Sequence, residues 1–314
     1  GIDCELENDN TAWIDLLTTD RKLYRQGILL LVGSALFLST SGIALRSIEQ
    51  ANGWQILFYR SIALSITVFL FLTYQKRRAV LDEFRDLGWN DVVMVVFFGT
   101  GMVAYVFALL YITVANALFI LSSTPFVAGI LGWIVLRERV AARTWFAIAA
   151  SIVGLVIMVG SGMASGHILG NLIAMYIPIA YAVMIVAVRR SKRESMLGAV
   201  CLGGLVAAGL SAVFITDYAL TPRDFGISIY LGIFQVGVGF TLMVLGTRFV
   251  PAAQVGLLSL VEPVLAPLWV WLSVGEVPAA TTLLGGAIIF LAIASYSTLN
   301  ILKPQNSAHY EASD

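Results

Sequence analysis

Ten apolar runs, each of about 20 residues, follow one another along this chain of 314 residues and contain almost no charged side chains. A helix of about 20 residues crosses the hydrocarbon core of a bilayer. Of all residues, 59% are hydrophobic and 12% are charged, where a soluble domain has roughly 45–50% and about 25%. We therefore expect an all-α polytopic membrane protein with ten transmembrane helices. The expected helices cover residues 27–46, 54–74, 91–112, 114–136, 144–162, 168–188, 196–215, 226–247, 252–274 and 281–301.

Basic residues gather on one side of these helices. All but three of the 19 lysines and arginines fall in the connections and tails of that side, the exceptions being Arg46, Arg60 and Arg223. Because cytoplasmic loops are enriched in lysine and arginine, both termini are expected in the cytoplasm. We expect a multi-pass protein of the cytoplasmic (inner) membrane, with cytoplasmic tails over residues 1–23 and 303–314.

The two halves of the chain share a residue pattern. At a shift of 138 positions the matching pairs are Pro125 and Pro263, Trp133 and Trp271, and Glu138 and Glu276. Each half, residues 24–162 and 163–302, then holds five helices. Because five is odd, the second half enters the membrane from the opposite side. Inverted repeats of this kind are typical of secondary transporters, whose site lies between the halves near the membrane midplane. The expected fold is two inverted five-helix repeats around a central cavity.

These features resemble the EamA-type branch of the drug/metabolite transporter superfamily. The resemblance is carried by the repeated proline-to-glutamate pattern and by two short stretches, ALRS at residues 44–47 and FYRS at residues 58–61. It implies a basket of ten helices that works by alternating access on metabolites such as amino acids. Thr124 occupies in the first half the place that Glu262 holds in the second. The family pattern therefore assigns no role to Glu262.

Glu262 is the sharpest candidate for a functional residue. It lies near the middle of the expected helix 252–274, where a charged side chain costs about 2.5–3.5 kcal/mol on insertion scales. It shares a helix face with Ser259, Ala266 and Trp269. Burial disfavours the charged form, so Glu262 could carry a proton or bind a cationic substrate group. Alternatively, a protonated Glu262 donates only to the Ser259 carbonyl, which Pro263 leaves without its helical donor.

Arg60 is the other charged residue well inside an expected helix. It lies about 9 Å along that helix from Trp54. An arginine at this depth can extend its side chain toward the outer headgroups and act as an anchor. Alternatively, it faces the cavity and either binds a carboxylate or pairs with Glu262 in one conformational state. The sequence leaves both interpretations open.

Further candidates are aromatic or polar residues within the expected helices. They could contact substrate, but side-chain packing or hydrogen bonding between helices also accounts for them. They are Tyr59, Tyr105, Asn116, Ser123, Trp133, Tyr181 and Gln254. The repeated residues Pro125, Glu138, Pro263 and Glu276 are expected to shape helix ends, with the two glutamates capping loops or contributing to gating.

The sequence lacks the features that are typical of several other classes of protein. There are two histidines and two cysteines, too few for a histidine metal site, a histidine triad in the membrane or a disulfide framework. No GxGxxG or Walker sequence is present, so ATP is not expected as the direct energy source. We expect neither an enzyme nor a nucleic-acid-binding protein, and no cofactor or metal.

The sequence thus predicts a secondary active transporter that exports or exchanges small organic metabolites such as amino acids. Proton coupling through Glu262 is one expected mechanism. The expected partners are a small-molecule substrate, protons and the lipid bilayer, with the protein a monomer or a weak dimer. Two alternatives stay open: an importer of a vitamin-like or nucleotide-like metabolite, and a membrane sensor or assembly subunit without transport.

Overall fold

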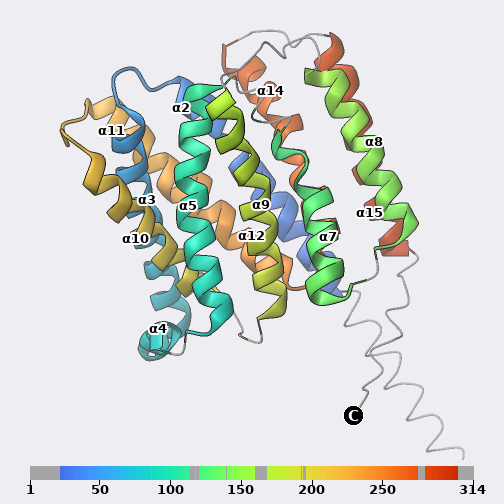
Figure 1. The fold of residues 1–314 in the computed structure, drawn as a ribbon, viewed down its shortest axis with the longest axis horizontal. Helices are drawn as coiled ribbons and strands as arrows, with labels where there is room; N and C mark the ends of the chain where they lie inside the picture. The colour runs from blue at the N-terminus through green and yellow to red at the C-terminus, as the bar shows by residue number, and fades with distance from the viewer. Residues whose placement is uncertain are drawn as a thin grey trace, which may run out of the picture.

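The structure, a computed structural model, is a bundle of helices that run broadly alongside one another (Figure 1). It describes residues 22–85, 87–112, 117, 120–138, 140–159, 168–191, 193, 196–274 and 280–302. Within these ranges the regular elements are all helical. Among the described residues, seven helices are long and apolar enough to cross a membrane, and three shorter apolar helices overlap the remaining expected spans. The all-helical membrane class is therefore confirmed, while the number of ten crossings stays a prediction.

The helices follow the order of the expected spans. The first helix covers residues 22–38 and is followed by α2 (Ser41–Arg46), α3 (Gly53–Lys76), η1 (Arg77–Leu81), α4 (Asp82–Arg85), α5 (Trp89–Tyr111), α7 (Thr124–Leu136) and α8 (Ala142–Val159). The second half contains α9 (Ile168–Arg190), α10 (Leu197–Phe214), α11 (Pro222–Tyr230), the π-helix η2 (Leu231–Val238), α12 (Gly239–Thr247), α13 (Ala252–Ser259), α14 (Val261–Val274) and α15 (Ala280–Leu302).

Several expected helices are interrupted. The expected continuous helix over 252–274 is wrong in this respect, because α13 ends at Ser259 and α14 begins at Val261. Pro263 lies in the first turn of α14, where a missing amide donor costs no helical hydrogen bond. Pro125 holds the same kind of position at the start of α7. Each repeated proline thus lies just after a helix break rather than inside a helix.

Two further irregularities occur. Ser39 and Thr40 form a turn that separates the first helix from α2, and each hydroxyl donates to a backbone carbonyl three residues earlier. Such local bonds compete with the helical pattern. The expected helix over 226–247 consists of α11, η2 and α12. A π-helix of this kind often occurs at a functional site.

Three close helix pairs each join a helix in one expected span of the first half to a helix in the corresponding span of the second. They are α3 with α10, α7 with α13, and α8 with α15. Small residues make this packing possible. A Cβ atom on Gly154 of α8 would lie 2.8 Å from the carbonyl oxygen of Gly285 in α15. One on Gly256 of α13 would lie 2.5 Å from the Cα of Pro125 in α7.

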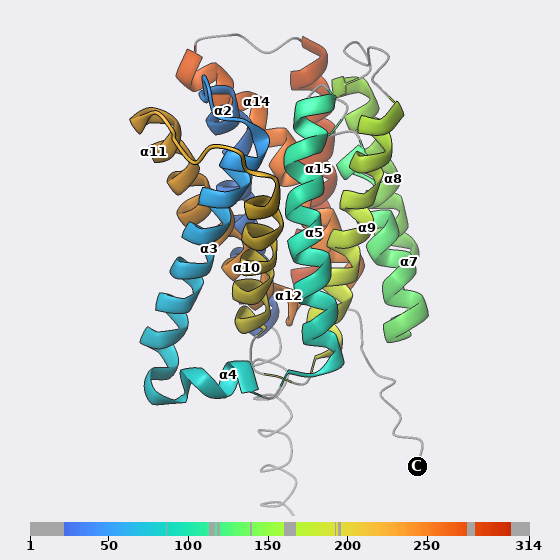
Figure 2. The same cartoon turned by 60° about the vertical axis from the view of Figure 1, so that its left-hand side comes forward.

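The two ends of the bundle differ in their polar contacts. We call them the α4 end and the α11 end, after the short helices that they carry (Figure 2). At the α11 end, the buried carboxylate of Asp224 accepts hydrogen bonds from the backbone amides of Glu49, Gln50 and Ala51 at 3.0–3.1 Å. This carboxylate therefore fixes the loop between α2 and α3 against the start of α11.

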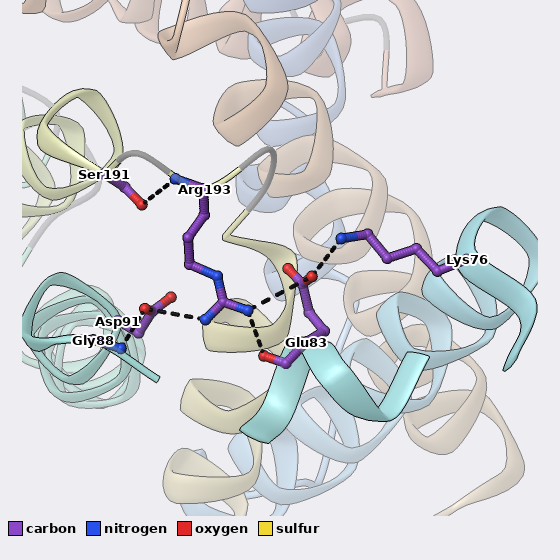
Figure 3. A network of polar contacts seen from close by, with 6 residues as sticks. All are labelled: Lys76, Glu83, Gly88, Asp91, Ser191 and Arg193. Atoms are coloured by element: carbon purple, nitrogen blue, oxygen red, sulfur yellow. Dashed lines mark hydrogen bonds and ion pairs between the residues drawn. The ribbon is translucent and has the colours of Figure 1, made fainter. Parts of the chain in front are cut away.

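At the α4 end, Arg193 lies between two buried carboxylates (Figure 3). Its Nη1 donates to Asp91 Oδ2 at 3.2 Å, and its Nη2 donates to the Glu83 backbone oxygen at 2.8 Å. The Glu83 carboxylate accepts from Lys76 Nζ at 2.6 Å. Asp91 Oδ2 also accepts from the Gly88 amide at 2.9 Å. These contacts connect α3, α4, the start of α5 and the segment after α9.

Candidate functional site

Two small cavities meet at Glu262, whose side chain is buried and lines both of them. The helix break at Leu260 places this residue in the first turn of α14. The first cavity is lined by Ser39, Ser41, Gly42, Tyr105, Leu109, Ala117, Leu121, Ile177, Glu262 and Ala266. The second is lined by Leu31, Ser34, Ala35, Leu38, Tyr181, Met243, Val255, Ser259 and Glu262. Glu262 therefore contacts both cavities from one interrupted helix.

Hydrogen bonds between helices surround the first cavity. The indole Nε1 of Trp269 donates to Ser39 Oγ at 2.7 Å, which connects α14 to the turn after the first helix. The hydroxyl groups of Ser41 and Tyr105 lie 2.7 Å apart, which connects α2 to α5. The interrupted segments therefore supply polar lining to this cavity, and the Trp269–Ser39 bond also joins the two halves.

Arg60 lies inside the bundle, where its side chain is only 3% exposed. Its guanidinium carbon is 5.5 Å from the centroid of the Tyr105 ring, within the range of a cation–π contact. It also interacts electrostatically with Glu262. The ion pairs found among the described residues do not include Arg60. This burial disfavours the interpretation of Arg60 as a headgroup anchor.

The repeat residue Glu138 lies at the α4 end and joins three segments. Arg189 Nη2 lies 2.5 Å from Glu138 Oε1, and the other carboxylate oxygen accepts from the Ala252 amide at 3.0 Å. A carboxylate at the start of α13 complements the positive end of that helix. Glu138 therefore makes a capping contact of the kind expected, whereas a part in gating stays a proposal.

The other predicted candidates divide by location. Tyr181 and Ser259 line the second cavity, whereas four candidates have other surroundings. Tyr59 donates to the Tyr218 carbonyl at the α11 end, and Trp133 is 62% exposed on the outer surface of the bundle.

Two polar candidates form hydrogen bonds with other protein groups. Ser123 donates to the carbonyl of Ile120, and Gln254 accepts from Tyr24. Asn116 and Glu276 lie outside the described residues.

Ser39 and Ser41 are the residues of the site that the sequence interpretation missed. They belong to the stretch STSG at residues 39–42, in which three hydroxyl residues precede a glycine inside an expected transmembrane helix. Hydroxyl side chains that bond to the local backbone favour a turn over a helix. This cluster was therefore a usable signal for a helix break beside a polar site.

Within the described residues, no group of three or more histidine, cysteine, aspartate or glutamate side chains is placed to hold a metal ion. The cavities instead combine one carboxyl group, serine hydroxyls, two tyrosines and an apolar wall. Such a lining can bind and release a small molecule.

Long apolar helices around a buried charged site define a polytopic helical membrane protein. The model of the EamA-like transporter family matches the chain twice, over residues 25–160 and 165–298. The protein therefore belongs to this family of membrane transporters, within the drug/metabolite transporter superfamily.

Individual relatives are more distant. An uncharacterized transporter, YwfM of Bacillus subtilis (strain 168), is 26% identical over 55% of this chain and 60% of its own length. An uncharacterized transporter of Archaeoglobus fulgidus is 26% identical over 67% of this chain and 77% of its own length. A solved crystal structure superposes with a TM-score of 0.74 at 21% identity, covering 88% of this chain and 97% of the other. That likeness supports the fold alone.

Proposed function

We propose that this protein is a secondary active transporter that exports or exchanges small organic metabolites such as amino acids by alternating access. The observation that carries the proposal is the position of Glu262, which is buried and lines both cavities. Transporters commonly place their binding site at interrupted helices near the midplane. Here α13 and α14 form such an interrupted helix.

The proposed architecture is ten transmembrane helices in two inverted repeats. Each of the pairs α3 with α10, α7 with α13 and α8 with α15 joins helices from corresponding expected spans of the two halves, although at the shift of 138 positions α7 matches α14. A two-fold axis between repeats brings such counterparts together, as it does at a symmetric dimer interface. The two matches of the family model along the chain support the same division.

In the proposed cycle the two repeats rock about the site. Glu262 is exposed alternately to the two sides of a cytoplasmic membrane and exchanges a proton or a cationic substrate group. The α4 end faces the cytoplasm, because basic residues gather there and cytoplasmic segments are enriched in lysine and arginine. The contacts of Arg189 with Glu138 and of Arg193 with Asp91 lie at that end, and in the proposed cycle they break when the cytoplasmic side opens.

The test is substrate flux into liposomes that contain the purified protein. A thermal-shift screen of amino acids, vitamins and nucleotides first identifies a stabilising compound. A pH gradient is then expected to drive its uptake, and Glu262→Gln is expected to abolish the dependence on that gradient. Glu49→Gln is the matched control, because Glu49 is an exposed glutamate at the α11 end.

Two results would contradict the proposal. Flux that is indifferent to the pH gradient and unchanged by Glu262→Gln would remove proton coupling through this residue. Labelling that places the two termini on opposite faces of the membrane would remove the inverted ten-helix architecture.

A further inference from the structure

The guanidinium group of Arg60 has unused hydrogen-bonding capacity. Its Nε and Nη1 atoms are buried and have no hydrogen-bond partner within the part of the chain that the structure describes. An arginine offers five donors in a planar fork, and buried polar groups are normally satisfied. A buried donor without a partner is costly, so two of them on one charged group require an explanation.

The helix packed against Arg60 adds a second unsatisfied group. The π-helix η2 lies so close that a Cβ atom on Gly232 would be 2.4 Å from the Arg60 carbonyl oxygen. Three residues further along η2, the buried Gln235 donates from Nε2 to the Leu38 carbonyl, and its Oε1 atom has no hydrogen-bond partner among the described residues. Two neighbouring elements thus present unpartnered donors and an unpartnered acceptor.

The adjoining cavity has a wall suited to an apolar group. Tyr105, over whose ring Arg60 lies, lines the first cavity. The same cavity is lined by the aliphatic side chains of Leu109, Leu121 and Ile177. A ligand with an anionic head at Arg60 and a short hydrocarbon chain along this wall would match both the guanidinium over the Tyr105 ring and the apolar lining.

Glu262 competes with such a ligand for Arg60. The two residues attract one another electrostatically but form no direct ion pair. When Glu262 carries a proton, as the proposed function requires in one state, its attraction to Arg60 is lost. An external anion then becomes the partner that the guanidinium lacks.

We propose that Arg60 forms an anion-binding subsite beside the first cavity, which takes the carboxylate of a small organic anion with a short apolar chain. The guanidinium fork matches a carboxylate in bidentate geometry. This inference rests on the proposed transport function and adds the chemical class of the group that is recognised.

The experiment compares two probes that differ only in the head group, sodium 4-methylpentanoate and the neutral 4-methylpentanamide. The thermal unfolding midpoint of the purified protein in nanodiscs is measured with each probe, for wild type and for three variants. In wild type the carboxylate raises the midpoint and the amide does not. Glu262→Gln enlarges the carboxylate shift, because a competing charge is removed.

Arg60→Met tests the subsite directly. The apparent affinity for 4-methylpentanoate falls by at least about tenfold, which corresponds to losing one charge-assisted hydrogen bond. Without probe, the midpoint of Arg60→Met equals or exceeds that of wild type, because an unsatisfied buried charge is replaced by an apolar side chain. Arg223→Met, which changes an exposed arginine, leaves the carboxylate shift unchanged.

Two outcomes overturn the subsite: no carboxylate-specific stabilisation of wild type, or a lower midpoint for Arg60→Met together with a retained carboxylate shift. The second result would make Arg60 a structural residue. Either one leaves the proposed transport function intact if the pH-driven flux of wild type persists. Conversely, the carboxylate shift could depend on Arg60 while the wild-type protein shows no flux. That result would support the subsite and contradict the transport function.

Discussion

The arginines at the α4 end and the arginine at the centre of the bundle have opposite environments. Arg189 donates from Nε to Glu138 at 2.6 Å and from Nη1 to the Val250 carbonyl at 2.7 Å. Arg193 likewise contacts Asp91 and the backbone of Glu83. Arg60 is more deeply buried than either, yet two of its nitrogens have no partner.

The number of satisfied donors distinguishes arginines with a structural role from an arginine with a functional role. A buried polar group left unsatisfied costs about 1–3 kcal/mol, so a protein retains one only where another requirement exceeds that cost. Arg189 and Arg193 connect helices and are satisfied by doing so. The unsatisfied Arg60 instead lies next to a cavity and an ionisable residue, an arrangement that a transient ligand would complete.

The largest expected loss of stability comes from Glu83→Leu at the α4 end. Glu83 is 3% exposed and pairs with Lys76 and Arg193. The substitution removes the carboxylate shared by Lys76 and Arg193, which are 23% and 22% exposed, at a cost of about 3 kcal/mol. Thermal unfolding in detergent measures this loss, with Asp82→Leu as the matched control because Asp82 is exposed. Equal shifts for the two variants would show that the pairing at this end is not structural.

Arg189→Met is expected to have the next largest effect, a loss of about 2 kcal/mol. The substitution leaves the Glu138 carboxylate, which is 20% exposed, without its cation. The matched control is Arg190→Met, because Arg190 is the exposed neighbour in the same helix. Arg60→Met, in contrast, is expected to be at least as stable as wild type. Similar losses of stability for Arg60→Met and Arg189→Met would show that the central arginine and the arginine at the α4 end do not differ in their structural role.

The sequence predicted the class of fold but not the helix breaks. Long uncharged runs fix the helical membrane class because every backbone polar group must be satisfied within lipid. Apolar runs alone do not show where a helix is interrupted, and Pro263 was placed inside a helix that in fact begins at Val261. The turn at Ser39 and Thr40 depends on local hydroxyl bonds that the apolar pattern does not indicate.

The sequence predicted the charged residues of the candidate site but not which aromatic residues belong to it. Glu262 and Arg60 were identifiable because a charge at membrane depth is costly wherever it points. Whether an aromatic residue faces a cavity or the outside depends on helix rotation, which one sequence leaves open. Tyr105 lies at the first cavity, whereas Trp133 lies on the outer surface.

A smaller effect, about 1 kcal/mol, is expected for Ser39→Ala in the polar layer beside the first cavity. The substitution removes the local hydrogen bond from Ser39 to the Leu36 carbonyl and the acceptor of the Trp269 indole hydrogen bond. A double-mutant cycle with Trp269→Phe isolates this bond, and a coupling energy of about 1 kcal/mol is expected from thermal unfolding. Zero coupling would show that the bond does not hold α14 against the first helix.

The smallest effect is expected for Arg223→Ala, which removes an ion pair with Glu49 at the α11 end. Both side chains are well exposed, at 60% and 59%. Exposed pairs contribute about 0–1 kcal/mol, since water and salt screen the attraction and ordering two long side chains costs entropy. Thermal unfolding is expected to show a small change at low salt and a still smaller one at high salt. If Arg223→Ala loses as much stability as Arg189→Met, an exposed ion pair stabilises the protein as much as a buried one. Ion pairing itself, and not the burial of an arginine whose donors are all bonded, would then distinguish the structural arginines from Arg60.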